Sequence, residues 1–235
     1  KEYICPKFLG LPDMVRNSIL DLPAIIDSEL NLYKGRIGIV RHILQLGKIL
    51  KTDGFRLFKA FSKAIKSQKR FESQLIKKPI LTRNINTRLK VLLLGHSYNI
   101  YDDFISMGII RKLKKHNVDF TTCEMVSRKN ILKGTKKLSK KMFWTLGKRN
   151  IGTANYFLEK KTVDGIIYVA SFGCGPDSLV GELIEKKAKG DYNIPFLYIN
   201  LDEHAGETGF NTRLEAFLDV MEGREYFENN FSAHG

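Results

Sequence analysis

The sequence contains 235 residues, of which 43% are hydrophobic, and it carries a formal net charge of +14. A chain of this length holds one large domain or two small ones around a buried core. Its apolar runs are all shorter than the roughly 18 residues that a membrane span requires, so a membrane-spanning protein is excluded.

The three cysteines are Cys5, Cys123 and Cys174, too few and too widely spaced for a disulfide scaffold. A reducing cytoplasm is therefore the expected location, where a loop cysteine is more often catalytic or metal-binding than bridged. Cys123 ends a predicted strand, and we expect it to be a packed thiol. The chain begins with Lys1 and shows no leader, which predicts that the start of a longer polypeptide is missing.

Most of the positive charge lies between Arg111 and Arg149, where 13 lysines and arginines face only two acids. Such a segment fits either an anionic partner or a solvated protein face. The solvated face is favoured, because the segment lacks the interleaved aromatics of a single-strand binder and any RNA-recognition or zinc-finger signature. Nucleic acid is therefore not expected as a partner.

Residues 1–87 are predicted to form a mostly helical inter-domain segment. One helix is expected to start near Pro23 and to run through Leu30. Apolar residues at helical spacing from about Arg36 predict another, and Thr52 or Asp53 is expected to cap the next. The aromatic residues of that last helix are predicted to face a core: Phe55, Phe58, Phe61 and Phe71.

Strands alternate with helices in residues 88–222, which predicts an α/β domain with a flavodoxin-like parallel sheet of four strands. The first run, Leu89 to Leu94, is continuously apolar and typical of a strand covered on both faces. The expected strand order is 2-1-3-4, and residues 223–235 are a predicted C-terminal tail. Strands are expected near 89–95, 118–122, 164–170 and 195–201, and helices at 104–113, 142–158, 178–188 and 211–221.

Ligands in such sheets bind beyond the carboxyl ends of the strands, so the loops that follow the strands are the predicted site. The loop after the third strand places Cys174 between Gly173 and Gly175, and Pro176 fits the first turn of the next helix. A helix N-terminus favours the thiolate. The pattern therefore predicts a metal ligand or a nucleophile, with a tight turn and an incidental cysteine as the alternative.

The loop after the fourth strand, residues 202–209, begins with Asp202-Glu203-His204, and such a polar cluster is costly beside a buried strand unless it is paired or binds something. These three residues are candidate catalytic groups. Thr212 and Glu215 have the spacing of a capping box for the last helix.

The loop after the first strand contributes His96 and Tyr98, which are candidate catalytic groups pointing at the same crevice. Asn99 and Asp102 are expected to cap the helix that follows. The sequence contains no Gly-x-x-x-x-Gly-Lys-Ser/Thr and no Cys-x-x-Cys motif, so nucleotide hydrolysis by this chain and a closed four-cysteine zinc site are not expected.

Four segments in chain order resemble the 2-hydroxyacyl-CoA dehydratase-related proteins, and most closely their acyl-CoA dehydratase activase-related branch. The resemblance implies two flavodoxin-like domains with an iron–sulfur cluster, expected to be 4Fe-4S, held between them by three cysteines. It also implies electron transfer from an ATPase partner with an actin-like fold, and an acyl-CoA-type substrate. The segments are Cys5–Asp13, Gly95–Asn99, Phe172–Asp177 and Asp202–His204.

Within this resemblance, Cys5 and Cys174 match two cluster-ligand positions, and Gly173 and Gly175 complete the predicted cofactor-binding set. The third cysteine ligand is expected in the missing N-terminal part. The leading functional hypothesis is an iron–sulfur redox component of dehydratase or reductase type, for which thiolates are suitable ligands.

Two other hypotheses stay open on the residues. In one, the chain is a hydrolase or transferase with Cys174 as nucleophile, His204 as base and Asp202 as the orienting group. In the other, it is a non-catalytic module whose basic segment docks an acidic partner such as the ATPase. The cluster hypothesis predicts that Cys5 lies near Cys174 in space, whereas the nucleophile hypothesis requires nothing of Cys5.

Overall fold

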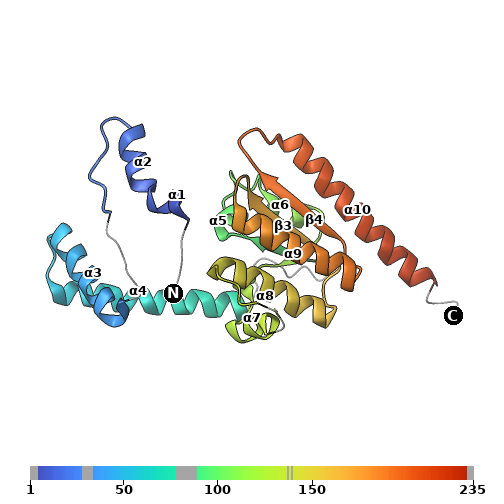
Figure 1. Ribbon diagram of the computed structural model, residues 1–235, viewed down its shortest axis with the longest axis horizontal. Helices are drawn as coiled ribbons and strands as arrows, with labels where there is room; N and C mark the ends of the chain where they lie inside the picture. Colours follow the sequence, from blue (N-terminus) through green and yellow to red (C-terminus); the bar gives the residue numbers. More distant parts are fainter. Residues whose placement is uncertain (1–4, 28–33, 78–88, 137, 139, 232–235) are drawn as a thin grey trace. The chain divides into compact units, whose positions relative to one another are not determined.

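The computed structural model describes residues 5–27, 34–77, 89–136, 138 and 140–231, and the chain divides into two units, Lys1–Ser73 and Gln74–Gly235. The predicted boundary at residues 87 and 88 lies outside the described residues. The elements, in chain order, are α1 (Pro6–Leu9), α2 (Leu11–Ser18), α3 (Gly35–Ile49), α4 (Gly54–Lys77), β1 (Lys90–Gly95), α5 (Ser97–Tyr101), α6 (Ile109–Lys115), β2 (Asp119–Thr121), η2 (Cys123–Met125), α7 (Arg128–Thr135), α8 (Thr145–Lys160), β3 (Gly165–Ser171), α9 (Gly175–Asp191), β4 (Phe196–Leu201) and α10 (Glu207–Phe231) (Figure 1).

In the first unit, the helix predicted near Pro23 is wrong for residues 22–27, which form neither helix nor strand. Leu30 lies outside the described residues. Two local features oppose a helix here. Asp21 has a left-handed φ of 57°, and Leu22 precedes a proline, which disfavours the helical conformation.

The start of α4 is capped by Asp53, whose Oδ1 accepts the backbone N–H of Arg56 at 2.9 Å, as predicted. The prediction that the apolar stripe of this helix is buried is wrong within the described residues, because Phe55, Phe58 and Phe71 are exposed and α4 has no buried residue. None of the described helices is long and apolar enough to cross a membrane.

In the second unit, four parallel strands form one sheet in the order β2-β1-β3-β4, which confirms the predicted flavodoxin-like arrangement. Lys90 and Asp164 fix the register at the start of β1. The Lys90 N–H donates to Asp164 Oδ2 at 2.6 Å, and the Asp164 N–H donates to the Lys90 carbonyl at 2.8 Å. Because β1, β3 and β4 are neighbours in this order, the loops at their carboxyl ends adjoin.

Alternate residues of each strand face opposite sides of the sheet, and each side is covered by its own helices (Figure 1). Leu93 and Val169 pack on one side against α5, α6 and α10. Leu92 and Tyr168 pack on the other side against α8 and α9. All four side chains are fully buried, and each contributes on the order of 2 kcal/mol to stability through burial.

The helix predicted at 104–113 begins late, at Ile109, because Met107 and Gly108 adopt left-handed φ values of 50° and 67°. The preceding residues form a turn in which Asp102 Oδ1 accepts two backbone N–H groups, at 3.0 and 2.9 Å. Asp102 is therefore the predicted capping group, although it caps this turn rather than α6. Helix α7 (Arg128–Thr135) was not predicted.

Parts of the basic segment are already paired. Lys112 Nζ lies 2.7 Å from Glu207 Oε1, and Arg149 lies 3.9 Å from Glu124 Oε1. Lys137 lies outside the described residues. These pairs reduce the charge that the segment offers to an anionic partner.

Candidate functional site

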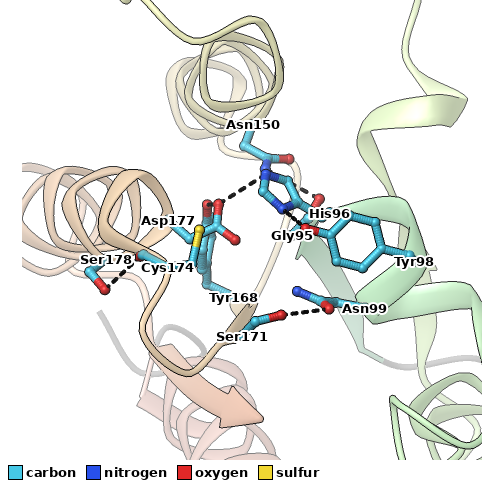
Figure 2. A network of polar contacts seen from close by, with 10 residues as sticks. All are labelled: Gly95, His96, Tyr98, Asn99, Asn150, Tyr168, Ser171, Cys174, Asp177 and Ser178. Carbon is cyan, nitrogen blue, oxygen red and sulfur yellow. Dashed lines mark hydrogen bonds and ion pairs between the residues drawn. The ribbon is translucent and has the colours of Figure 1, made fainter. Parts of the chain in front are cut away.

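The loops after β1 and β3 bring His96, Cys174 and Asp177 together at the carboxyl edge of the sheet. Figure 2 shows these side chains turned toward one another. One ligand-type atom from each residue lies within 4.8 Å of the other two. This group contains two residues that the sequence analysis selected and one, Asp177, that it did not.

Cys174 occupies the N-cap position of α9, directly after Gly173 in the β3–α9 loop. Gly173 has a φ of 73°, a conformation that other residues resist, so the predicted need for glycine is confirmed there. Gly175 is already helical and an added Cβ would meet nothing within 4 Å, so its lack of a side chain is not required sterically. The backbone carbonyl of Cys174 accepts from the Ser178 N–H and hydroxyl, both at 3.0 Å, which fixes the helix start.

His96 is held by contacts on both ring nitrogens. Its Nε2 lies 3.3 Å from Asp177 Oδ1, and its Nδ1 lies 2.6 Å from the Tyr98 hydroxyl. The predicted site residues His96 and Tyr98 therefore act as a pair, with Tyr98 orienting the ring that faces Asp177. Neither residue caps α5 with its side chain.

Asp177 is a buried carboxylate, 1% exposed. The Tyr168 hydroxyl donates to its Oδ1 at 3.0 Å, whereas its Oδ2 is buried without a hydrogen bond of ordinary geometry to the described residues. Burial raises the pKa of Asp177, and the neighbouring His96 charge, the Tyr168 hydroxyl and the Cys174 thiol oppose that rise. The site thus contains an acid whose charged form lacks full compensation.

Two buried amides brace the loop that carries His96. Asn99 Oδ1 accepts from the Ser171 hydroxyl at 2.9 Å, which ties this loop to the end of β3. Asn150 of α8 donates to the Gly95 carbonyl at 3.2 Å. The predicted capping role of Asn99 is therefore wrong. The Asn99 side chain is 1% exposed, and a buried amide requires hydrogen-bond partners inside the protein. Its oxygen therefore bonds Ser171 instead of capping the helix that follows.

The predicted group Asp202-Glu203-His204 is not part of this cluster. The side chains of Glu203 and His204 are 81% and 88% exposed, and Glu203 Oε1 lies 3.8 Å from His204 Nε2. Asp202 Oδ1 accepts the backbone N–H of His204 rather than orienting the imidazole ring. The carboxylate is therefore used in the turn, and the contact expected of a catalytic Asp–His pair does not form.

The last helix also begins differently from the prediction. Helix α10 starts at Glu207, and Thr212 lies inside it, where its hydroxyl donates to the Thr208 carbonyl at 3.1 Å. The predicted capping box of Thr212 and Glu215 is therefore wrong. Glu207 pairs with Lys112, which lowers the pKa of the glutamate.

Cys5 lies in the first unit, exposed, at the N-cap position of α1. Its backbone carbonyl accepts the Phe8 N–H at 3.0 Å. Because Cys5 and Cys174 belong to different units, their proximity stays a prediction.

The third cysteine, Cys123, is buried and almost inaccessible to solvent. Cys123 is buried behind β1, and its thiol donates to Glu124 Oε1 at 3.0 Å, an oxygen that also accepts from the Ser97 hydroxyl at 2.8 Å. Burial, reinforced by the Glu124 charge, raises the pKa of this thiol. The expectation of a packed thiol agrees with this environment.

We expect Cys123 to react with thiol reagents at least about tenfold more slowly than Cys174, because a raised pKa and burial both lower the accessible thiolate. The measurement compares two double variants, Cys5→Ser with Cys123→Ser and Cys5→Ser with Cys174→Ser, in a disulfide-exchange assay at about pH 8. The same assay in denaturant is the control, where both thiols should react alike. Equal rates in the folded proteins would contradict the burial of Cys123.

Two family models match the chain over adjoining ranges. The CoA enzyme activase uncharacterised domain matches residues 1–126, more than half of the chain. The 2-hydroxyglutaryl-CoA dehydratase D-component matches residues 131–221. No match was found among curated proteins. His96 thus lies in the first match and Cys174 and Asp177 in the second, so the candidate site draws on both. The chain belongs to the 2-hydroxyacyl-CoA dehydratase- and activase-related family.

Proposed function

We propose that the protein is an iron–sulfur redox component of a 2-hydroxyacyl-CoA dehydratase- or activase-type system, and that Cys5 and Cys174 are cluster ligands. The observation that carries the proposal is the position of Cys174, half-buried at the start of α9 in a glycine loop, within the part of the chain that matches the dehydratase D-component. Such D-components are generally associated with iron–sulfur clusters.

The donor set of the described residues fits one corner of such a cluster. Thiolates are the usual ligands of these clusters, and the Cys174 thiol is partly accessible at the carboxyl edge of the sheet. Cys123 does not fit, because it is buried and its raised pKa disfavours the thiolate. Cys5, exposed at the start of α1, is the remaining thiol of this sequence and the second proposed ligand.

The bound cluster, proposed to be 4Fe-4S, supplies one-electron transfer. Around it, His96 and Tyr98 form a hydrogen-bonded pair that presents an imidazole beside Cys174. The imidazole and the Asp177 carboxyl tune the charge next to the thiolate and hold a proton close to the reacting centre. The proposed context is the cytoplasm, with an actin-fold ATPase as electron donor and an acyl-CoA-type substrate.

The test is the iron and sulfide content of the protein purified without oxygen. We expect Cys5→Ser and Cys174→Ser each to remove most of the bound iron and any redox activity together, because each deletes a thiolate ligand. Cys123→Ser is the matched control and should keep both, since that thiol is buried, bonds Glu124 and does not belong to the His96, Cys174 and Asp177 group. Full iron in the Cys5→Ser variant would overturn the cluster assignment.

A further inference from the structure

We propose that His96, Cys174 and Asp177 form a binding site for a single divalent transition-metal ion of the Zn²⁺, Fe²⁺ or Co²⁺ type in the cluster-free protein. The inference goes beyond the proposed function, because all three ligands come from one unit and nothing is required of Cys5. The ligand set is one imidazole nitrogen, one thiolate sulfur and one carboxylate oxygen.

The spacing of the three ligand atoms fits one ion. Ligands on a tetrahedral ion at bond lengths of about 2.0–2.3 Å lie about 3.4–3.7 Å apart. His96 Nε2 and Asp177 Oδ1 are already 3.3 Å apart, and all three ligand atoms lie within 4.8 Å of one another. A separation of 4.8 Å exceeds the tetrahedral value by about 1 Å, so binding one ion requires side-chain movements of that size.

An independent observation points to an ion at the same place. Asp177 is 1% exposed, and its Oδ2 is buried without a hydrogen bond of ordinary geometry among the described residues. A buried carboxylate oxygen without a donor of ordinary geometry is costly when charged, because the neighbouring Cys174 thiol is only a weak donor. A cation next to the Asp177 carboxylate would offset that cost, and the charges of Asp177 and the Cys174 thiolate would neutralise the cation.

Two tyrosine hydroxyls bond His96 and Asp177, as outer residues commonly bond and orient the ligands of a metal site. The Tyr98 hydroxyl holds His96 Nδ1 at 2.6 Å, and with the ring proton on Nδ1 the Nε2 atom that faces Asp177 has the lone pair that binds an ion. The Tyr168 hydroxyl holds Asp177 Oδ1 at 3.0 Å and fixes the carboxylate. With three protein ligands the ion keeps one open position, as in catalytic zinc sites.

The same ligand set defines selectivity. Imidazole and thiolate suit borderline-soft ions, whereas Mg²⁺ and Ca²⁺ prefer several oxygen ligands. The site is therefore expected to bind Zn²⁺ and Co²⁺ and to show no measurable binding of Mg²⁺ at millimolar concentrations.

The test is Co²⁺ binding to the protein after metal and cluster have been removed with a chelator. We expect one Co²⁺ per chain, visible d–d absorption of four-coordinate cobalt and a thiolate-to-cobalt charge-transfer band. Cys174→Ser should abolish that band, and His96→Gln and Asp177→Asn should each weaken binding at least about tenfold. Cys123→Ser is the matched thiol control and should bind like the wild type. Unfolding curves of each variant show whether the fold is intact.

Cys5→Ser separates this inference from the proposed function. Retained Co²⁺ binding in Cys5→Ser, together with loss in Cys174→Ser, supports the local site whatever the iron content of the protein purified without oxygen. Loss of Co²⁺ binding in folded Cys5→Ser, or wild-type affinity in folded Asp177→Asn, would overturn it. Those outcomes leave the cluster proposal to its own measurement of iron and sulfide.

Discussion

Replacing Gly134 with alanine is expected to lower the free energy of unfolding by about 3 kcal/mol, because the helix pair α7–α8 has no room for a methyl group. An added Cβ at Gly134 would lie 1.9 Å from the Gly152 carbonyl oxygen and 2.9 Å from the Tyr156 backbone nitrogen. Both are backbone atoms that cannot rotate away, so the helices must separate. The Gly134 carbonyl also accepts from Asn155 Nδ2 at 2.8 Å, a buried hydrogen bond that the separation would break.

The measurement is urea unfolding followed by circular dichroism. The matched control is Gly190→Ala in α9, where an added Cβ meets nothing within 4 Å. There, alanine should leave stability unchanged or raise it by up to about 1 kcal/mol, since glycine is the more flexible residue in the unfolded chain. Wild-type stability in Gly134→Ala would mean that α7 and α8 do not pack this closely.

Replacing Asp177 with asparagine is expected to stabilise the metal-free protein at neutral pH, by on the order of 1 kcal/mol. The pKa of Asp177 is raised in the folded protein, mainly by burial, so the folded state holds this proton more tightly than the unfolded state does. The stability that this tighter proton binding contributes is fully present below the pKa of Asp177 in the unfolded chain. It is lost as the pH rises through the pKa of Asp177 in the folded protein. Asparagine has no such loss, and it keeps an acceptor for the Tyr168 hydroxyl.

The advantage of Asp177→Asn should therefore be small near pH 4 and grow as the pH rises, when unfolding is measured with chelator present. Glu207→Gln is the control of opposite sign. Lys112 lowers the pKa of the exposed Glu207, so the pair helps the fold slightly above the unfolded pKa and the variant should lose that help. A wild type that becomes increasingly more stable than Asp177→Asn toward high pH would contradict the raised pKa of Asp177.

The sheet was predictable because its signal is local. Leu89 to Leu94 form a continuous apolar run, and such a run between helical segments has few alternatives to a buried parallel strand. The expected order of the strands is that of the flavodoxin-like fold, and the structure has it. Cys174 was found in the same way, because glycine and proline mark its loop.

The surroundings of the Asp177 and His204 side chains could not be predicted from the sequence. An acid in the first turn of a helix is normally exposed and favourable there, so the position of Asp177 gave no sign that its side chain turns inward to Tyr168 and His96. His204 looked catalytic because it follows a buried strand. Its ring is exposed because the helix starts at Glu207 and Asp202 is used by the turn. Both outcomes depend on tertiary contacts that spacing along the chain does not encode.

The central position of β1 also determines when the domain can form during translation. β1 is hydrogen-bonded to β3, whose residues are synthesised about seventy positions later, and the Lys90–Asp164 contacts join segments 74 residues apart. A nascent chain that has emerged only to α8 exposes the β3-facing edge of β1 and apolar strand surface to solvent. Such a chain needs shielding by a chaperone or by the ribosome surface until β3 emerges. Pausing of translation before residue 165 should therefore be more harmful than pausing after β4, when every strand of the sheet is available.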